Sequence, residues 1–329
     1  MSYIEPIKKN LISILRRTRA GNNIFFGIKH KLGRVHTPDM DFPELISIEI
    51  ASACNISCVH CPPQIREMSS QRRKHSLMDL ETFYKLMDEV DKFGPRRIAL
   101  HKDGEPLLHP QIPEILKRVK QKNQHNVYLT TNAIKLSNNI SDSILENRID
   151  IINFSIGAAT EKFYEKVRGK GFGKMMDNIH NFLGLAERST WKPKVLVQII
   201  NLPEFPEMKD EIKEFKRHWS KFNVEIEVWE KLTWGTFEPV KKLNYRYPCY
   251  SLWDSFNINS NGVVTACCMD WTQGLNIGNV NDKSIYEIWH DGALRKLREL
   301  HIAGKENELP PCEKCNYWEW QPMLKDYPL

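Results

Sequence analysis

Hydrophobic and polar positions follow two alternating patterns through the middle of the chain. Six short runs rich in aliphatic and β-branched residues have the length of buried strands, and stretches with apolar residues at helical spacing separate them. The first of these stretches places Leu80, Phe83, Met87, Val90 and Phe93 on one helical face. The pattern predicts strands at residues 46–50, 97–101, 127–131, 151–155, 194–200 and 224–229.

Further helices are predicted between the strands, at residues 112–122, 142–147, 161–188 (in two pieces) and 208–222. Strands that alternate with helices form βα units and a parallel sheet. Six such units are too few for a closed eight-stranded barrel. We therefore expect an α/β fold built on an open, partial barrel.

The alternation stops after Lys231. Residues 256–259 and 263–266 are predicted as a hairpin, because Ser260-Asn261-Gly262 between them is a turn sequence. Residues 285–300 have a helical pattern, and so small a unit would benefit from a bound metal. We divide the chain into an N-terminal helix and connector (1–44), the partial barrel (45–235) and a small C-terminal α+β unit (236–329).

The net charge of +6 is concentrated near the N-terminus. Residues 1–34 carry eight basic side chains and one acidic one, so the rest of the chain is close to neutral. This argues against a nucleic-acid-binding protein, whose basic residues usually cover a face of the folded domain. Residues 3–19 are predicted as an amphipathic helix, and packing on the barrel explains it better than a membrane surface does. Because the chain has neither a long apolar run nor a signal-peptide core, we expect a cytoplasmic protein without a transmembrane helix.

Eight cysteines fall into two groups separated by a long stretch without any. Thiols stay reduced in the cytoplasm, so clustered cysteines there are more often metal ligands than disulfides. We therefore expect two separate metal sites. The first group is Cys54, Cys58 and Cys61, and the second is Cys249, Cys267, Cys268, Cys312 and Cys315.

The first group directly follows the first predicted strand. Three thiolates on one loop can bind three irons of a [4Fe–4S] cluster and leave the fourth iron open to another ligand. A structural zinc site normally has four protein ligands, and unrelated buried cysteines are the other alternative. The spacing of Cys54, Cys58 and Cys61 favours the cluster.

The Cys-x3-Cys-x2-Cys spacing after the first strand resembles the radical S-adenosylmethionine (SAM) superfamily. The resemblance implies a partial (β/α)6 barrel and a [4Fe–4S] cluster with SAM on its open iron. It also implies that an electron, from a donor such as flavodoxin or ferredoxin, cleaves SAM to methionine and a 5′-deoxyadenosyl radical. That radical takes a hydrogen atom from the substrate. His60 occupies the position where the family usually has an aromatic residue against the adenine.

Other short motifs support the resemblance. Asp103-Gly104-Glu105-Pro106 is similar to the family's Gly-Gly-Glu-Pro, with an aspartate in place of the first glycine, and Thr130-Thr131-Asn132 is similar to its Thr-Asn-Gly. Arg168 could instead be an exposed helix residue, and Gln198 enters only because strand alternation points it inward. The SAM-binding residues that we predict are His60, Gly104, Glu105, Asn132, Ser155, Arg168 and Gln198.

The second group offers four thiolates, Cys249, Cys267, Cys312 and Cys315. By themselves they suit iron and zinc about equally. The segment up to Cys315 also resembles the SPASM/twitch extension of radical SAM enzymes, and its five cysteines fit the shorter form, which implies one auxiliary [4Fe–4S] cluster. Cys268 would point away from Cys267 if both lie on an extended strand. It is then a plain buried residue, an alternative ligand, or a catalytic hydrogen donor to a substrate radical.

The expected substrate is a small polar molecule, namely a sugar, an aminocyclitol or an aminoglycoside. An auxiliary cluster that accepts an electron would favour dehydrogenation, and a free thiol that returns hydrogen would favour epimerisation. The alternative is a peptide-modifying maturase of the radical SAM/SPASM type. Many of those carry a peptide-recognition domain of about 80 residues, and only about 45 residues precede the first strand here. A non-catalytic iron–sulfur or zinc scaffold is a third hypothesis.

Overall fold

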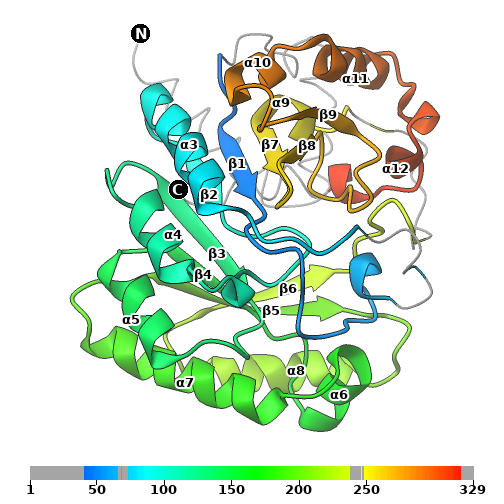
Figure 1. Cartoon of the computed structure of the whole chain (residues 1–329). Coiled ribbons are helices and arrows are strands. Elements are labelled where there is room, and N and C mark those ends of the chain that lie inside the picture. Colours follow the sequence, from blue (N-terminus) through cyan, green and yellow to red (C-terminus); the bar gives the residue numbers. More distant parts are fainter. Residues whose placement is uncertain (1–40, 66–67, 69–72, 238–245, 247, 320–329) are drawn as a thin grey trace, which may run out of the picture.

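The computed structural model describes residues 41–65, 68, 73–237, 246 and 248–319. The predicted helix at residues 3–19 lies outside these residues. One nine-stranded sheet, in the order β6-β5-β4-β3-β2-β1-β7-β8-β9, runs through the molecule (Figure 1). Its strands are β1 (Leu45–Ile48), β2 (Arg97–Ala99), β3 (Asn126–Thr131), β4 (Ile151–Ser155), β5 (Lys194–Asn201), β6 (Glu225–Glu230), β7 (Ser255–Ile258), β8 (Val263–Thr265) and β9 (Asn276–Asn279).

Strands β1 to β6 pair in parallel, each with the next, and helices connect them as the alternation predicted. In the described part of the chain the sheet has two free edges, β6 and β9, so the barrel is open. No helix of this part combines the length and the apolar composition needed to cross a membrane. The connecting helices are α3 (Leu80–Val90), α4 (Ile112–Val119), α5 (Asn138–Glu146), α6 (Glu161–Arg168), α7 (Phe172–Arg188) and α8 (Met208–Trp219).

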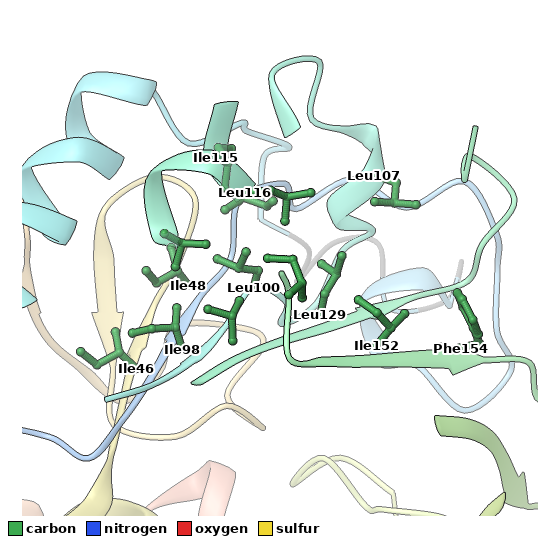
Figure 2. Packing of buried hydrophobic residues seen from close by; sticks show 14 of the residues in the cluster. Ile46, Ile48, Ile98, Leu100, Leu107, Ile115, Leu116, Leu129, Ile152 and Phe154 are labelled. Carbon is green, nitrogen blue, oxygen red and sulfur yellow. The ribbon is translucent and has the colours of Figure 1, made fainter. Parts of the chain in front are cut away.

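The hydrophobic core lies between the sheet and these helices. Successive strand side chains point to opposite faces, so every second residue of a strand enters this core. Figure 2 shows aliphatic side chains of the strands gathered against Ile115 and Leu116 of α4. On β4, Ile152 and Phe154 are fully buried in this cluster, and Ser155 belongs to the opposite, concave face of the sheet. The concave face is therefore free to carry polar residues.

The C-terminal strands do not form a sheet of their own. β7 pairs in parallel with β1, with Leu45 opposite Ser255, and β8 returns beside β7 in the predicted hairpin. Gly262 ends the turn with φ of +85°, a conformation that favours glycine. Around these strands lie α9 (Ser251–Asp254), α10 (Ile285–Trp289), α11 (Gly292–Ile302) and α12 (Pro310–Glu313) (Figure 1).

The single helix predicted at residues 285–300 is wrong, because the chain breaks there into α10 and α11. Ser284 and Glu287 form a capping box at the start of α10. The Asp291 carboxylate then accepts a hydrogen bond from the Gly292 amide and caps a new helix. The Asp-Gly pair was the signal in the sequence for this break.

Truncation of Phe256 should destabilise the junction of the sheet. Phe256 on β7 is fully buried and its ring lies 6.4 Å from that of Trp289. We expect Phe256→Ala to lower the free energy of unfolding by about 3–5 kcal/mol, measured by anaerobic denaturant titration. Tyr84→Ala, at a position 39% exposed on α3, is the control and should cost less than about 1 kcal/mol. Equal losses would contradict this packing role.

Candidate functional site

The first cysteine group lies on the loop that follows β1, at the carboxyl end of the parallel strands. The amides of Ser57 and Val59 donate to the carbonyls of Arg168 (3.2 Å) and Val167 (3.0 Å), which docks the loop on the C-terminal end of α6. Burial raises the pKa of the Cys54 thiol to about 12 and that of Cys61 as well, and the neighbouring Cys58 raises both further. The three thiols line one pocket together.

Arg168 is a buried part of this site and not an exposed helix residue, at 4% exposure. Its Nε donates to Cys58 Sγ (3.2 Å), its Nη2 donates to Ser155 Oγ (2.9 Å), and its Nη1 donates to the Ser155 carbonyl. A permanent cation thus lies against the cysteine loop. It suits a site that collects thiolates or a carboxylate.

Glu105 connects the loop to the ends of two strands. Its Oε1 accepts from Thr131 Oγ1 (2.6 Å) and from the Leu107 amide (3.0 Å), and its Oε2 accepts from the Asn132 amide (2.8 Å). Asn132 Nδ2 in turn donates to Asn55 Oδ1 (2.8 Å) on the cysteine loop. Burial raises the pKa of Glu105, and the hydrogen bonds from Asn132 and Thr131 oppose this rise. Glu105 therefore orders the loop through hydrogen bonds.

Gly104 acts through its backbone. A Cβ at this position would lie 2.1 Å from the Ala51 carbonyl oxygen and 2.7 Å from that of Ala53, so only glycine fits against the start of the cysteine loop. The next amide, of Glu105, donates to the Ala53 carbonyl (2.8 Å). Asp103, the aspartate in place of the family's first glycine, has room for a side chain, which accepts hydrogen bonds from Lys102 and Arg73. At Gly104 the two carbonyls leave no such room.

His60 and Gln198 complete the pocket. His60 is 7% exposed, and burial, together with the charge of Arg168, lowers the pKa of its imidazole to about 3, so the ring is neutral at pH 7. All the predicted SAM-binding residues line the pocket that also holds the first three cysteines. They are His60, Gly104, Glu105, Asn132, Ser155, Arg168 and Gln198.

Sequence reasoning missed a buried ionic network beside this pocket. Arg73 Nη1 and Nη2 donate to the two carboxylate oxygens of Glu49 (3.0 and 2.8 Å), and Nη2 also donates to Asp103 Oδ2 (2.7 Å). Lys102 Nζ donates to the same Asp103 oxygen (2.6 Å). Burial alone would raise the pKa of Glu49, but its bond to Arg73 and the charges of Lys102 and Arg73 lower it to about 2.

Part of this network could have been found in the sequence. Glu49 interrupts an apolar strand pattern, and Lys102 follows a strand at the carboxyl edge where parallel sheets bind ligands. Arg73 gave no signal, because it lies in a polar loop whose path only the fold determines.

The network reaches the C-terminal unit. Lys102 Nζ donates to the Asp270 carbonyl (3.1 Å), and Arg73 Nε donates to the Trp271 carbonyl (3.0 Å). The Ser260 amide and hydroxyl both donate to Glu49 Oε2 at 3.0 Å. The two halves of the chain are therefore joined by charged groups as well as by the sheet.

The second cysteine group converges on a smaller pocket. Cys249, Cys267, Cys312 and Cys315 line it, and burial raises the pKa of Cys249 well above its usual range, with Cys315 and Cys312 adding to the rise. Arg246, beside them, donates from Nη1 to the Cys312 carbonyl (2.5 Å). Among the described residues, no three His, Cys, Asp or Glu side chains are arranged around a single metal ion. Four separate thiols around a pocket fit a cluster whose irons each bind a different cysteine.

Cys267 and Cys268 do not lie on an extended strand, so our premise for their opposite orientation is wrong. β8 ends at Thr265, whose Oγ1 donates to the Cys267 carbonyl (3.1 Å) and bends the chain. A hydrogen bond with Cys267 lowers the pKa of Cys268, burial opposes this, and Tyr317 lowers it further. The charges of Lys102 and Asp103 also act on Cys268. Cys267 lines the second pocket. The Cys268 thiol is hydrogen-bonded to that of Cys267 and is also under the influence of the charges of Lys102 and Asp103.

Comparison with known proteins matches two families. A sequence model of the radical SAM superfamily matches residues 48–217, and one of an iron–sulfur cluster-binding domain, SPASM, matches residues 249–316. GTP 3′,8-cyclase of Chlorobaculum tepidum is 27% identical over 165 residues, which are 50% of this chain and 48% of that protein. The chain thus spans about half the length of the curated relatives it matches.

Solved structures share the fold. BtrN in complex with AdoMet and 2-DOIA has a TM-score of 0.56 at 17% identity, over 83% of this chain and 92% of BtrN. SuiB of Streptococcus suis bound to the precursor peptide SuiA has a TM-score of 0.61 at 15% identity, over 82% of this chain and 69% of SuiB. At identities this low, the similarity shows only that the structures share the arrangement of their helices and strands.

A side chain at position 104 should disturb the cysteine loop. Because its Cβ would overlap the Ala51 carbonyl, we expect Gly104→Ala to reduce the iron bound after anaerobic reconstitution by about half, through loss of the first cluster only. Gly173→Ala on α7 is the control, since nothing lies within 4 Å of a Cβ there, and its iron content should equal that of the wild type. Full iron content in Gly104→Ala would contradict the close approach.

Proposed function

The chain belongs to the radical SAM superfamily and carries a C-terminal SPASM iron–sulfur domain, and we propose that it oxidises or epimerises a small polar substrate. The observation that carries this proposal is the place of residues 101–105. They line the SAM pocket, and Lys102 in the same segment hydrogen-bonds to the loop after Cys268. A substrate in this pocket would lie between the two cysteine groups.

The residues of the site would have the following roles. Cys54, Cys58 and Cys61 would hold the first [4Fe–4S] cluster, which with bound SAM would supply a 5′-deoxyadenosyl radical to take a hydrogen atom from the substrate. Arg168, which is held by Ser155, would orient the SAM carboxylate through its guanidinium group. The other predicted residues would line the pocket around the rest of SAM. They are His60, Gly104, Glu105, Asn132 and Gln198.

Cys249, Cys267, Cys312 and Cys315 would hold the auxiliary [4Fe–4S] cluster, and Cys268 would remain a thiol. Cys268, under the influence of Lys102 and Asp103, would be available to give its hydrogen atom to a substrate radical, and the thiyl radical left behind would need one electron from the external reductant and a proton to become a thiol again. Without that step, the substrate radical would lose a proton and pass its electron to the auxiliary cluster, which gives a dehydrogenation. An external reductant, such as flavodoxin or ferredoxin, would supply the electron that starts the cycle.

Polar groups on one stretch of the pocket wall favour a sugar or an aminocyclitol over a peptide, and apolar side chains line much of the rest. His101, Lys102 and Asp103 carry these polar groups. BtrN, of similar fold, binds the small molecule 2-DOIA, and SuiB binds a peptide. A radical SAM/SPASM peptide maturase is the alternative, and release of 5′-deoxyadenosine only with peptides would support it.

Iron counting and SAM cleavage test the chemistry. The anaerobically reconstituted protein should hold about eight irons, and a variant with Cys54, Cys58 and Cys61 all replaced by alanine should hold about four. With SAM and dithionite the wild type should release 5′-deoxyadenosine, and the triple variant should release none. Zinc in the C-terminal site, or no 5′-deoxyadenosine from protein with both clusters, would contradict the proposal.

Single replacements distinguish the two adjacent cysteines. Because Cys267 lines the second pocket, Cys267→Ala should lose the auxiliary cluster, and Cys268→Ala should keep about eight irons. Electron paramagnetic resonance of the reduced proteins would count the clusters. The reverse result would make Cys268 the ligand.

Solvent deuterium tests whether Cys268 is the hydrogen donor. If the enzyme is an epimerase, the wild type should place deuterium from the solvent in the product of a sugar or aminocyclitol. Cys268→Ala should still cleave SAM but should form no deuterated product.

A further inference from the structure

Several buried polar atoms in the SAM pocket lack a hydrogen-bond partner among the described residues. A buried polar group without a partner is costly, and where several line one pocket, a ligand or water that binds there can supply the missing hydrogen bonds. All four belong to residues that line this pocket. They are His60 Nδ1, Gln64 Nε2, His101 Nδ1 and Asp103 Oδ1.

The hydrogen bonds of Asp103 indicate which kind of ligand group its free oxygen would bind. Its side chain is 1% exposed, and its Oδ2 accepts from both Lys102 Nζ (2.6 Å) and Arg73 Nη2 (2.7 Å). Glu49 in turn binds Arg73, so two carboxylates face two cations and their formal charges cancel. The free oxygen, Oδ1, therefore requires a hydrogen-bond donor and no additional positive charge.

The position of Asp103 agrees with a substrate-binding role. Asp103 lines the pocket that also holds Cys54, Cys58 and Cys61. Its partner Lys102 donates to the Asp270 carbonyl (3.1 Å), two residues after Cys268. Asp103 thus lies on the wall between the first cysteine group and the C-terminal unit, where a substrate would have to lie.

His101 provides a second polar group, two residues before Asp103. Its ring lies edge-on to Tyr128, with ring centres 5.1 Å apart, and burial lowers its pKa to about 4. The imidazole is therefore neutral at pH 7, with one nitrogen that donates and one that accepts. A hydroxyl group, which also both donates and accepts, matches this pair.

We propose that Asp103 Oδ1 and the His101 imidazole form a subsite that binds a hydroxyl group of the substrate. The inference rests on the proposed function and narrows its substrate class to polyhydroxylated rings, with hydroxyl preferred to ammonium at this position. The two residues bind and orient the substrate beside SAM. Asp103 and His101 are therefore specificity residues, and neither is a ligand of an iron–sulfur cluster.

Binding measured without turnover tests the subsite. The reconstituted, SAM-loaded protein is titrated by calorimetry with myo-inositol and with 2-deoxystreptamine, a diaminocyclitol, in the absence of reductant. The wild type should bind myo-inositol more tightly. In Asp103→Asn the amide oxygen would face Lys102 and Arg73, and its NH2 group would replace the free acceptor. The affinity for myo-inositol should then fall about tenfold or more, and SAM affinity should stay within about twofold.

Two further variants separate recognition from folding. His101→Phe keeps the ring contact with Tyr128 but removes both nitrogens, and should also weaken myo-inositol binding about tenfold. Asp91→Asn is the matched control, because Asp91 is another carboxylate with a 1% exposed side chain, bound to Arg118 and His125 outside the pocket. It should leave both affinities unchanged.

The proposal is overturned if the wild type binds neither probe or binds the diamine more tightly. It is also overturned if Asp103→Asn and His101→Phe keep the affinity for myo-inositol, or if Asp103→Asn loses SAM instead, which would make Asp103 a SAM ligand. Failure of the proposed function is a different result. It would appear as no 5′-deoxyadenosine on reduction, an assay that needs neither probe.

Discussion

The parallel pairing of β1 with β2 on one side and β7 on the other is the interaction on which the rest of the structure depends. β1 carries the first cysteine loop at its carboxyl end, and β7 leads into the hairpin that precedes Cys267. Because carboxyl ends of parallel strands meet at one edge of a sheet, this pairing brings the turn at Ser260 to the edge that carries the first cysteine loop. The segment after Cys268 is held there by the bonds from Lys102 and Arg73 to the Asp270 and Trp271 carbonyls. An N-terminal and a C-terminal segment thus become neighbours in one sheet.

The ionic network fixes how closely these neighbours approach. Glu49 extends from the end of β1, Asp103 follows β2, and Ser260 follows β7, so three adjacent strands each contribute to it. Four charged groups out of water stabilise one arrangement only when every bond is made, since an unpaired buried charge is very costly. The network therefore gives the pocket around the first three cysteines a well-defined wall on the side of the C-terminal unit. One carboxylate oxygen of that wall, Asp103 Oδ1, faces no partner among the described residues.

Some residues of the site are needed for their chemical groups, and others are needed because of the space or the backbone contacts at their positions. The three cysteines supply thiols, the side chains that iron–sulfur clusters take as ligands. Gly104 is needed because a carbonyl lies where its Cβ would be, and Glu105 makes its hydrogen bonds to the chain itself. Arg168 serves both needs, since its guanidinium holds Ser155 and also places a cation beside Cys58. A substitution at such a position would alter the shape and the electrostatics of the pocket together.

The sequence by itself determined the βα order, the open barrel, the hairpin and the two cysteine groups, because these depend on periodicity and on spacing within short segments. Through motifs that resemble those of a known family, it also predicted the residues that gather around the first three cysteines. Only the tertiary structure decided that β7 extends the barrel's sheet, that Cys267 and Cys268 lie on a bend, and that Arg73 reaches Glu49 and Asp103. Those features arise between segments far apart in the chain, where side-chain contacts and desolvation select one partner among many, and no local pattern records that selection.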